Sequence, residues 1–382
     1  MAEVEGVRQR NLSRLLRIVH LDGPLSRAAL TGATGLNRST IADLVAELEG
    51  AGLVIERAPD PSRRVGRPSP VVAADPRVVA VAANPEVDAL TLGAVGLDRE
   101  IRVRERIEVD HLLTPDETAR LIADRIVQWR GGPLAQARIA GVGLAVPGLV
   151  RAVDGLVRNA PHLGWNDVPV RDLVSAATGL ATTVGNDASL GTLAEHLFGA
   201  ARGIDDVVYL NGGASGIGGG LIVQGMPVGG AGGYSGEFGQ NRPGIAAAAD
   251  RRADDGTLED EVSRARLLAV AGLTTADEPA LAAALGAAGP AARDEIDRQR
   301  RILATALANA VNVLNPSVVV LGGFLATLAD DDLSGLTALV AVQAMPANME
   351  DLSIRVASLA EDRLLIGAAE SAFAELLRAP AA

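Results

Sequence analysis

Apolar side chains recur at helical spacing in two stretches near the start of the chain. Leu12, Leu15, Leu16 and Val19 fall at positions i, i+3, i+4 and i+7, which is the pattern of one buried helix face. The same spacing returns within residues 41–48. Two glycines follow, and the apolar run after them predicts a short strand.

Capping residues divide this region into three helices. Ser26 follows a Gly-Pro pair and can cap a short helix with the sequence RAAL. Asn37 ends the turn TGLN and can cap a third helix that runs to about Glu49. The order helix, helix, glycine-containing turn, helix and strand is typical of a winged helix-turn-helix.

In a winged helix-turn-helix, polar side chains at the start of the third helix can reach base edges and phosphates in the major groove. The loop after the predicted strand, PDPSRRVGRPSP, is cationic and rich in Gly and Pro, which suits a minor groove or a phosphate track. The alternative is a three-helix interaction domain with a solvated basic linker. The predicted DNA-binding residues are Ser26, Arg27, Asn37, Arg38, Ser39, Thr40, Arg63, Arg64 and Arg67.

From Arg77 onward, short apolar runs alternate with helical segments. Residues 115–130 are expected to form a helix, and residues 318–323 (VVVLGG) a buried strand after a long Ala-rich helix. A closing helix is expected at residues 363–378. Alternation on this scale predicts an α/β fold with mixed sheets.

Charge is divided unevenly along the chain. The first 70 residues carry ten Arg against eight acidic residues, whereas the rest carries 25 Arg against 39 acidic residues, for a net charge of −12. The acidic part would repel nucleic acid, so any DNA contact has to come from the N-terminal part. No apolar run is long enough to span a membrane or to form a signal-peptide core, so we expect a cytoplasmic protein with no membrane partner.

Two absent residue types exclude several kinds of site. The chain has no Cys, which excludes disulfides, thiolate metal ligands and Cys nucleophiles. It also has no Lys, because all 35 cationic side chains are Arg, and this excludes a Walker-type phosphate loop.

Residues 211–220 read NGGASGIGGG, and a loop this rich in glycine lets backbone N–H groups approach a phosphate. It continues to AGGYSGEFG and is accompanied by VRNAPHLGWNDVPVRDL, VGNDASLGTLAEHLFGAARG and NPSVVVLGG. With SRAALTGATGLNRSTI and VGRPSP near the start, these stretches resemble the ROK family (repressors, open reading frames and sugar kinases), in particular its sugar-responsive repressor branch. The resemblance implies an α/β chain with a winged helix-turn-helix over residues 1–76. A two-lobed, actin-like ATPase (ribonuclease H-like) sensing domain would occupy residues 77–382.

The resemblance also implies a sugar site. Asn186 and Asp187 match the family's sugar-binding Asn and its catalytic Asp. Glu237 matches a glutamate that holds sugar hydroxyls, and Glu259 matches a more distant sugar-binding glutamate. From the dipeptide alone, Asp187 could instead cap a helix. The predicted ligand-binding residues are Asn186, Asp187, Glu237, Gln240, Glu259 and His162.

The family's zinc site is not expected in this chain. Three residues after Glu237 the family has a His that ligates zinc, where this chain has Gln240. Before Glu259 the family has a Cys-rich segment, where this chain has RPGIAAAADRRADDG. We therefore expect no metal and no other cofactor, and another means of holding residues 241–258.

The family's kinases begin this domain with an Asp and a Gly-Gly-Thr-like turn whose N–H groups face phosphate. The corresponding residues 84–88 read NPEVD, with no glycine, a proline that lacks an N–H, and two carboxylates that would repel ATP. We therefore expect no catalytic residue and no enzymatic activity, although Asp187 would be the base if the chain were a kinase.

The sequence predicts a repressor of carbohydrate uptake or catabolism genes. Its expected partners are double-stranded operator DNA and a sugar or sugar-phosphate effector, in a homodimer or a dimer of dimers because palindromic operators need two readers. One alternative is an ATP-dependent hexose or N-acetylhexosamine kinase. A second is a DNA-binding scaffold that binds no sugar and is controlled by a protein partner.

Overall fold

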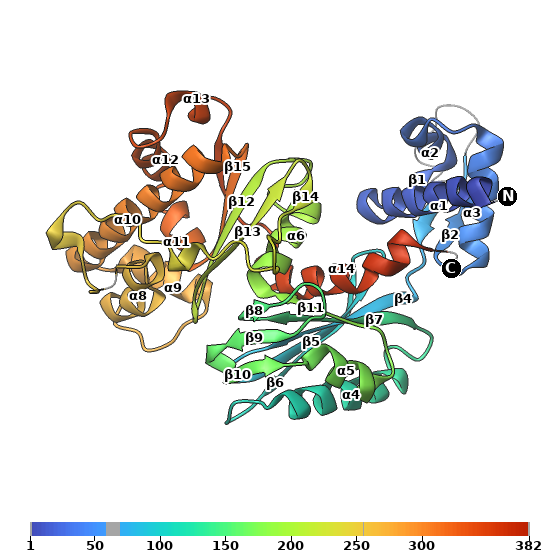
Figure 1. Ribbon diagram of the computed structural model, residues 1–382, viewed down its shortest axis with the longest axis horizontal. Helices are drawn as coiled ribbons and strands as arrows, with labels where there is room; N and C mark the ends of the chain where they lie inside the picture. Colours follow the sequence, from blue (N-terminus) through green and yellow to red (C-terminus); the bar gives the residue numbers. More distant parts are fainter. Residues whose placement is uncertain (1, 59–68, 255, 381–382) are drawn as a thin grey trace. The chain divides into compact units, whose positions relative to one another are not determined.

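The computed structural model describes residues 2–58, 69–254 and 256–380 (Figure 1). These residues form two compact units. The first holds the described residues of Met1–Val146, Asp154–Gly185 and Leu365–Ala382, and the second those of Pro147–Val153 and Asn186–Leu364. Among the described residues, no helix is both long and apolar enough to cross a membrane.

The first unit begins with three helices and a small antiparallel sheet of order β1-β3-β2. All apolar residues of the two predicted helix faces are buried, which confirms those helices. Strand β3, which pairs with both β1 and β2, was not predicted. These elements are α1 (Ala2–Asp22), β1 (Leu25–Ser26), α2 (Arg27–Thr34), α3 (Arg38–Gly50), β2 (Val54–Arg57) and β3 (Val71–Ala74).

The rest of the first unit is built on a five-stranded sheet of order β11-β7-β4-β5-β6, in which β4 pairs parallel with β7 and antiparallel with β5. Helices α4 and α5 lie on one face of the sheet and α14 on the other (Figure 1). The elements are β4 (Val78–Pro85), β5 (Ala89–Gly96), β6 (Ile101–Glu108), α4 (Pro115–Arg130), β7 (Arg138–Val146), β9 (Val157–Ala160), η1 (Pro161–Leu163), β10 (Trp165–Val168), α5 (Val170–Thr178), β11 (Thr182–Asn186) and α14 (Arg363–Arg378).

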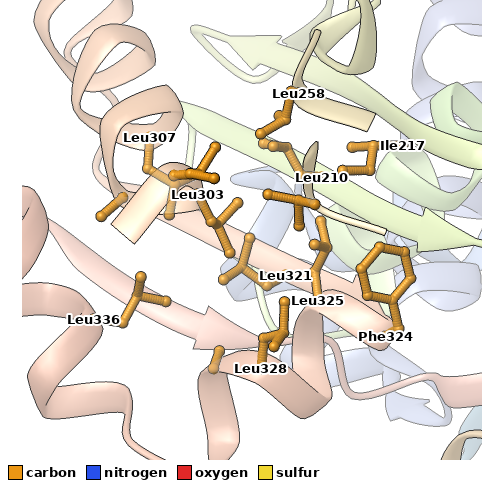
Figure 2. Close-up of a cluster of buried hydrophobic side chains, with 14 of the residues drawn as sticks. Leu210, Ile217, Leu258, Leu303, Leu307, Leu321, Phe324, Leu325, Leu328 and Leu336 are labelled. Carbon is orange, nitrogen blue, oxygen red and sulfur yellow. The ribbon is translucent and has the colours of Figure 1, made fainter. Parts of the chain in front are cut away.

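The second unit is built on a five-stranded sheet of order β14-β13-β12-β15-β16. Figure 2 shows its main core, where Leu210 and Leu321 of the sheet meet Leu303 and Leu307 of a long helix and Phe324 after β15. The elements are β8 (Leu149–Val150), α6 (Asp187–Phe198), β12 (Val207–Gly213), β13 (Gly216–Val223), β14 (Met226–Pro227), η2 (Phe238–Gln240), η3 (Ala248–Asp250), α7 (Leu258–Glu261), α8 (Arg264–Val270), α9 (Glu278–Ala287), α10 (Pro290–Leu314), β15 (Val318–Gly323), α11 (Phe324–Asp330), α12 (Leu333–Ala341), α13 (Pro346–Met349), β16 (Ser353–Val356) and η4 (Ala360–Asp362).

The glycine-rich stretch 211–220 is a β-hairpin and not the loop that its composition suggested. Strands β12 and β13 pair up to Gly213 and Gly216. The glycines of β13 allow close packing, because a Cβ at Gly218 would lie 2.7 Å from the Cβ of Ala188, and one at Gly220 would overlap the Thr192 hydroxyl. Helix α6 therefore lies directly on the backbone of β13.

Replacing Gly220 by Ala should lower the free energy of unfolding by about 1–3 kcal/mol, because the added methyl has to displace α6. Denaturant unfolding of the purified variant measures this. Gly286→Ala in α9 is the matched control, since its methyl would meet nothing within 4 Å, and it should be neutral or slightly stabilising. Equal stability of both variants would show that α6 does not need the glycine.

Candidate functional site

Asn186 and Asp187 lie where β11 ends and α6 begins. Asn186 is the cap of this helix: its Oδ1 accepts a hydrogen bond from the Ser189 N–H at 2.9 Å, and its Nδ2 donates one to the Gly148 carbonyl at 3.1 Å. Asp187 is the first helical residue, and its Oδ1 accepts a hydrogen bond from the adjacent Ala188 N–H at 2.8 Å. The capping role that Asp187 could have filled therefore falls to Asn186.

The pKa of the Asp187 carboxylate is shifted from its ordinary value. Burial raises its pKa, and the Ala188 N–H and the positive charge of Arg363 offset only part of that effect. Perturbed carboxylates of this kind concentrate at binding and catalytic sites.

Two further predicted ligand residues, Gln240 and Glu259, contact each other. Gln240 Nε2 donates to Glu259 Oε1 at 2.5 Å, and the Ile217 N–H donates to Glu259 Oε2 at 3.1 Å. A Cβ at Gly239 would lie 2.6 Å from this carboxylate, so the glycine gives Glu259 its room. The placement of Glu259 without a zinc site is thus explained by hydrogen bonds.

Glu237 belongs to the same group of acidic side chains. It remains accessible to solvent, yet the surrounding protein displaces enough water to raise its pKa, and the negative charges of Asp187 and Glu259 raise it further. The second unit therefore brings together three carboxylates and the Gln240 amide. Such a set can accept hydrogen bonds from several hydroxyl groups of one polyol. His162 is exposed and lies in the first unit, in η1, so its predicted role in ligand binding stays a prediction.

Two residues near Asp187 were not predicted. Arg363, the first residue of α14, acts electrostatically on Asp187 and on Tyr209. Tyr209 is buried in β12, and its hydroxyl donates to Asn211 Oδ1 at 3.2 Å. Because Arg363 lies far from Asp187 in the sequence, only the folded chain could show that the two interact.

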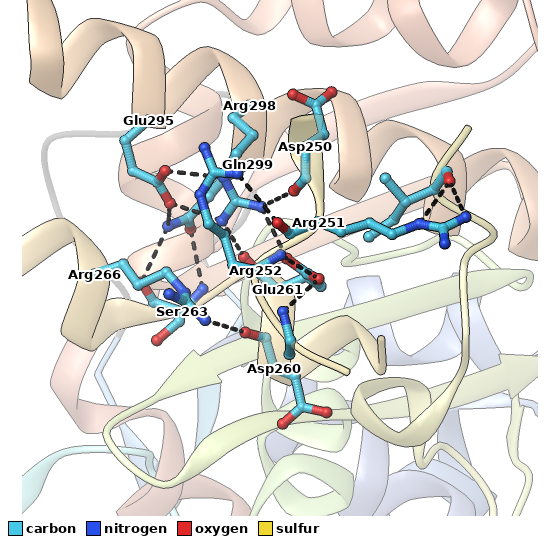
Figure 3. Close-up of polar contacts among 12 residues, drawn as sticks. Asp250, Arg251, Arg252, Asp260, Glu261, Ser263, Arg266, Glu295, Arg298 and Gln299 are labelled. Atoms are coloured by element: carbon cyan, nitrogen blue, oxygen red, sulfur yellow. Dashed lines mark hydrogen bonds and ion pairs between the residues drawn. The ribbon is translucent and has the colours of Figure 1, made fainter. Parts of the chain in front are cut away.

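The residues present do not fit a zinc ion. No described group of three or more His, Asp or Glu side chains is arranged to hold a metal, and the chain has no Cys. Instead, the segment before α7 is held by an arginine of α10. Figure 3 shows Arg298 between the carboxylates of Glu261 and Glu295.

Arg298 uses its whole guanidinium group in this cluster. Its Nη1 donates to the Asp250 carbonyl at 2.7 Å and to Glu261 Oε2 at 2.9 Å, and its Nη2 and Nε donate to Glu295 at 2.7 and 2.9 Å. Glu261 in turn accepts from the backbone N–H groups of Arg252 and Ala253 at 2.8 and 3.0 Å. Burial by itself would raise the pKa of Glu295, but the hydrogen bonds from Arg298 and Gln299 outweigh it and lower that pKa.

The predicted DNA-binding residues that the structure describes lie at the starts of helices α2 and α3. Ser26 caps α2 and Asn37 caps α3, each accepting a hydrogen bond from an N–H three residues later. Arg38 and Ser39 are exposed at the start of α3. Arg27 forms a bidentate ion pair with Glu56 of β2, in which Nε and Nη2 donate to the two carboxylate oxygens at 2.5 and 2.7 Å. Arg63, Arg64 and Arg67 lie outside the described residues.

The acidic turn between β4 and β5 is held by its own side chains. Glu86 accepts hydrogen bonds from the Asn84 amide at 3.1 Å and from the Thr91 hydroxyl at 2.8 Å. Asp88 accepts from Arg106 at 2.9 Å. The Arg106 cation is therefore already paired with the turn's own carboxylates.

A separate cavity of about 970 Å³ lies in the second unit beside the end of β15. Its walls combine apolar side chains with five carboxylates and a single arginine, Arg363. Its acidic residues are Asp277, Glu278, Asp330, Asp331 and Glu361.

Known repressors and kinases resemble this chain to different extents. The Xylose repressor of Caldicellulosiruptor bescii is 24% identical over 401 residues, covering 98% of each chain. The Glucokinase of Thermotoga maritima is 29% identical, covering 73% of this chain and 93% of its own. The crystal structure of a ROK family transcriptional regulator, a homolog of the E. coli MLC protein, superposes with a TM-score of 0.77 at 23% identity, covering 98% of both chains.

The family model for the ROK family matches residues 87–374. The predicted α/β class, with actin-like ATPase-type sheets, is confirmed by this match and by the two five-stranded sheets. The chain belongs to the ROK family.

Proposed function

We propose that this protein is a sugar-responsive transcriptional repressor. The observation that carries the proposal is the similarity to a protein named Xylose repressor, which covers 98% of the chain and so includes the N-terminal helices. The similarity to the Thermotoga glucokinase covers only 73% of the chain. The regulated genes would be those for uptake or catabolism of a sugar. The N-terminal boundary at residue 76 and the two-domain division are part of this proposal.

The N-terminal elements would form a winged helix-turn-helix. Helix α3 would enter the major groove with Asn37, Arg38, Ser39 and Thr40 at its start, because these side chains are exposed or half-exposed and are not needed in the core. Strands β2 and β3 pair antiparallel, and Arg63, Arg64 and Arg67, which lie between them in the sequence, would also contact DNA. Ser26 and Arg27, at the start of α2, would approach the sugar-phosphate backbone of the DNA.

The effector would be a sugar or sugar phosphate bound in the second unit. Asp187, Glu237 and Glu259 would accept hydrogen bonds from sugar hydroxyls, while Gln240 can both donate and accept. Asn186 would support them as the cap of α6, whereas a ligand-binding role for His162, which lies in the first unit, stays a prediction. A homodimer or a dimer of dimers would present two DNA-reading helices to a palindromic operator.

The kinase alternative rests on the glucokinases among the relatives. Against it, the turn 84–88 has no glycine and holds its carboxylates through internal hydrogen bonds and Arg106, so it offers no phosphate cradle. The cavity beside β15 is strongly acidic as well. Sugar-dependent ATP turnover that is abolished by Asp187→Asn would establish the kinase and contradict a purely sensing role of this domain.

Footprinting on the DNA flanking the protein's own gene, with and without D-xylose and D-glucose, tests the repressor. Arg38→Ala should weaken binding to the protected duplex by about 10-fold and alter its sequence preference, because one such contact contributes about 1–3 kcal/mol. Arg130→Ala, an exposed arginine at the end of α4, removes the same charge and should bind normally. Unchanged affinity of Arg38→Ala would contradict the assignment of α3 as the reading helix.

A further inference from the structure

Helix α1 is docked on helix α14 within the first unit. The hydroxyl of Ser13 donates to the Leu377 carbonyl at 2.6 Å. His20 lies deeper in the interface, where its Nε2 is 2.9 and 3.1 Å from the two carboxylate oxygens of Glu370. The ring of Phe373 meets His20 edge-on, with 6.0 Å between centroids. The proposed DNA-binding segment is therefore tied to α14 by a buried polar pair.

The His20 ring is fully engaged. Its other nitrogen, Nδ1, lies 2.6 Å from the Leu97 carbonyl, so the protonated ring can donate from both nitrogens, one to Leu97 and one to Glu370. His20 and Glu370 are only 1% and 6% exposed, which makes the loss of either partner costly. This pair specifies one position of α1 on α14.

The opposite face of α14 packs against the sheet. A Cβ at Gly143 of β7 would overlap the Ala368 carbonyl, so the helix backbone lies in direct contact with the strand. The hydroxyls of Thr183 and Ser371 add a hydrogen bond of 2.7 Å between β11 and the same helix. Helix α14 therefore lies between the sheet and α1.

The start of α14 belongs to the unit that carries the candidate sugar site. Arg363, its first residue, acts on Asp187, and the helix continues without a break into the first unit from Leu365. The chain just before Arg363 is also anchored to α6, because the buried Glu195 carboxylate accepts from the Ser358 and Leu359 N–H groups at 3.0 and 2.9 Å. Asp187 and Glu195 are thus on one helix, and the first acts on Arg363 while the second binds the chain just before α14.

We infer that the His20–Glu370 pair couples sugar binding to DNA affinity, with α14 as the continuous element between them. The inference rests on the proposed function and adds the residues that regulate it. Sugar bound beside Asp187 changes the environment of Arg363 and so the position of α14, and His20 makes α1 follow that movement. Without the pair, each site keeps its own ligand but the two no longer affect each other.

The experiment compares DNA affinity with and without sugar in the full-length protein. The probe is a fluorescent duplex from the region that the wild-type protein protects, with D-xylose or D-glucose as the sugar, and the readout is the ratio of the two dissociation constants. We expect a ratio of about 10 in the wild-type protein, within the usual range of allosteric coupling. In Glu370→Gln, which keeps the side-chain shape, and in His20→Gln, the ratio should fall toward 1 while sugar affinity stays within about 2-fold of wild type.

Ser13→Ala is the matched control, because it weakens the same helix interface without removing the charged pair. It should keep the wild-type ratio. A wild-type ratio in Glu370→Gln, or an equal loss in Ser13→Ala, would overturn the inference. Absence of DNA binding or of any sugar effect in the wild-type protein would overturn the proposed function as well, and it would be seen before any variant is made.

A pH series separates coupling from simple packing. Burial acts to lower the pKa of His20 and so does the nearby Arg99 charge, but Glu370 and the Leu97 carbonyl outweigh both, so that pKa lies above its usual value. The pair is therefore fully formed below about pH 6.5, the ordinary His value, and is lost as pH rises through the raised pKa. The coupling ratio of the wild-type protein should fall over that range, and that of Glu370→Gln should not change.

Discussion

Replacing Arg298 by Ala should lower the free energy of unfolding by about 3–5 kcal/mol, the usual cost of removing one partner from a buried ion pair. Arg298 is 2% exposed and Glu261 is fully buried, so the variant leaves two carboxylates without their cation. The carbonyl of Asp250 and the N–H groups of residues 252–253 lose their anchor at the same time. Denaturant unfolding followed by circular dichroism measures the loss.

The matched control for this prediction is Arg301→Ala, three residues further along α10. Arg301 also pairs with Asp250, at 2.8 and 3.1 Å, but its side chain is 48% exposed. Surface pairs of this kind contribute about 0–1 kcal/mol, so this variant should be nearly as stable as the wild type. A loss below about 1 kcal/mol in Arg298→Ala would show that the cluster does not hold the segment before α7.

A second comparison isolates the charge from the packing. The triple variant Arg298→Met, Glu261→Gln and Glu295→Gln removes all three buried charges together and should recover part of the stability, because no uncompensated charge remains. The amide oxygen introduced at position 261 can still accept hydrogen bonds from the backbone N–H groups of residues 252 and 253. Recovery relative to Arg298→Met alone, which has the same side-chain volume at position 298, would show that unpaired charge causes the loss of stability.

The elements that the sequence predicted well are those whose apolar spacing is unambiguous. Helix α4 begins and ends at the predicted residues, as do β15 and α14. Strand β6 was missed because IRVRERIE is an edge strand in which Arg and Glu alternate with apolar residues. The glycine hairpin was missed because the glycines that permit α6 to pack on β13 also resemble a flexible loop.

The candidate site could be predicted from the sequence only through the resemblance to a family. Nothing in the local pattern distinguishes Glu237 or Glu259 from other surface acids, and Asp187 by itself suggested a helix cap. The Arg298 cluster joins residues 37 positions apart and contains no motif, so it could not be predicted. Contacts of this kind depend on how α10 packs against α7, which local periodicity does not encode.

Asp187→Asn should weaken sugar binding by about 10- to 100-fold, because hydrogen bonds to a charged group contribute about 1.5–3 kcal/mol each. Glu237→Gln should have a similar effect. Isothermal titration with D-xylose or D-glucose measures both, and Asp116→Asn, an exposed acid in the first turn of α4, is the control. Undiminished sugar affinity in both site variants would contradict the placement of the ligand beside these carboxylates.

The pH dependence of sugar affinity gives a sharper test of the same site. Hydroxyl groups donate to the ionised carboxylates, so the affinity should be full above the raised pKa values of Asp187 and Glu237 and should fall as pH drops through them. The fall should therefore begin at a higher pH than for an ordinary carboxylate, whose pKa is about 4. Because the Asp187 charge helps to raise the pKa of Glu237, Asp187→Asn should move the remaining transition to lower pH. An unshifted transition would mean that the Asp187 charge does not act on Glu237.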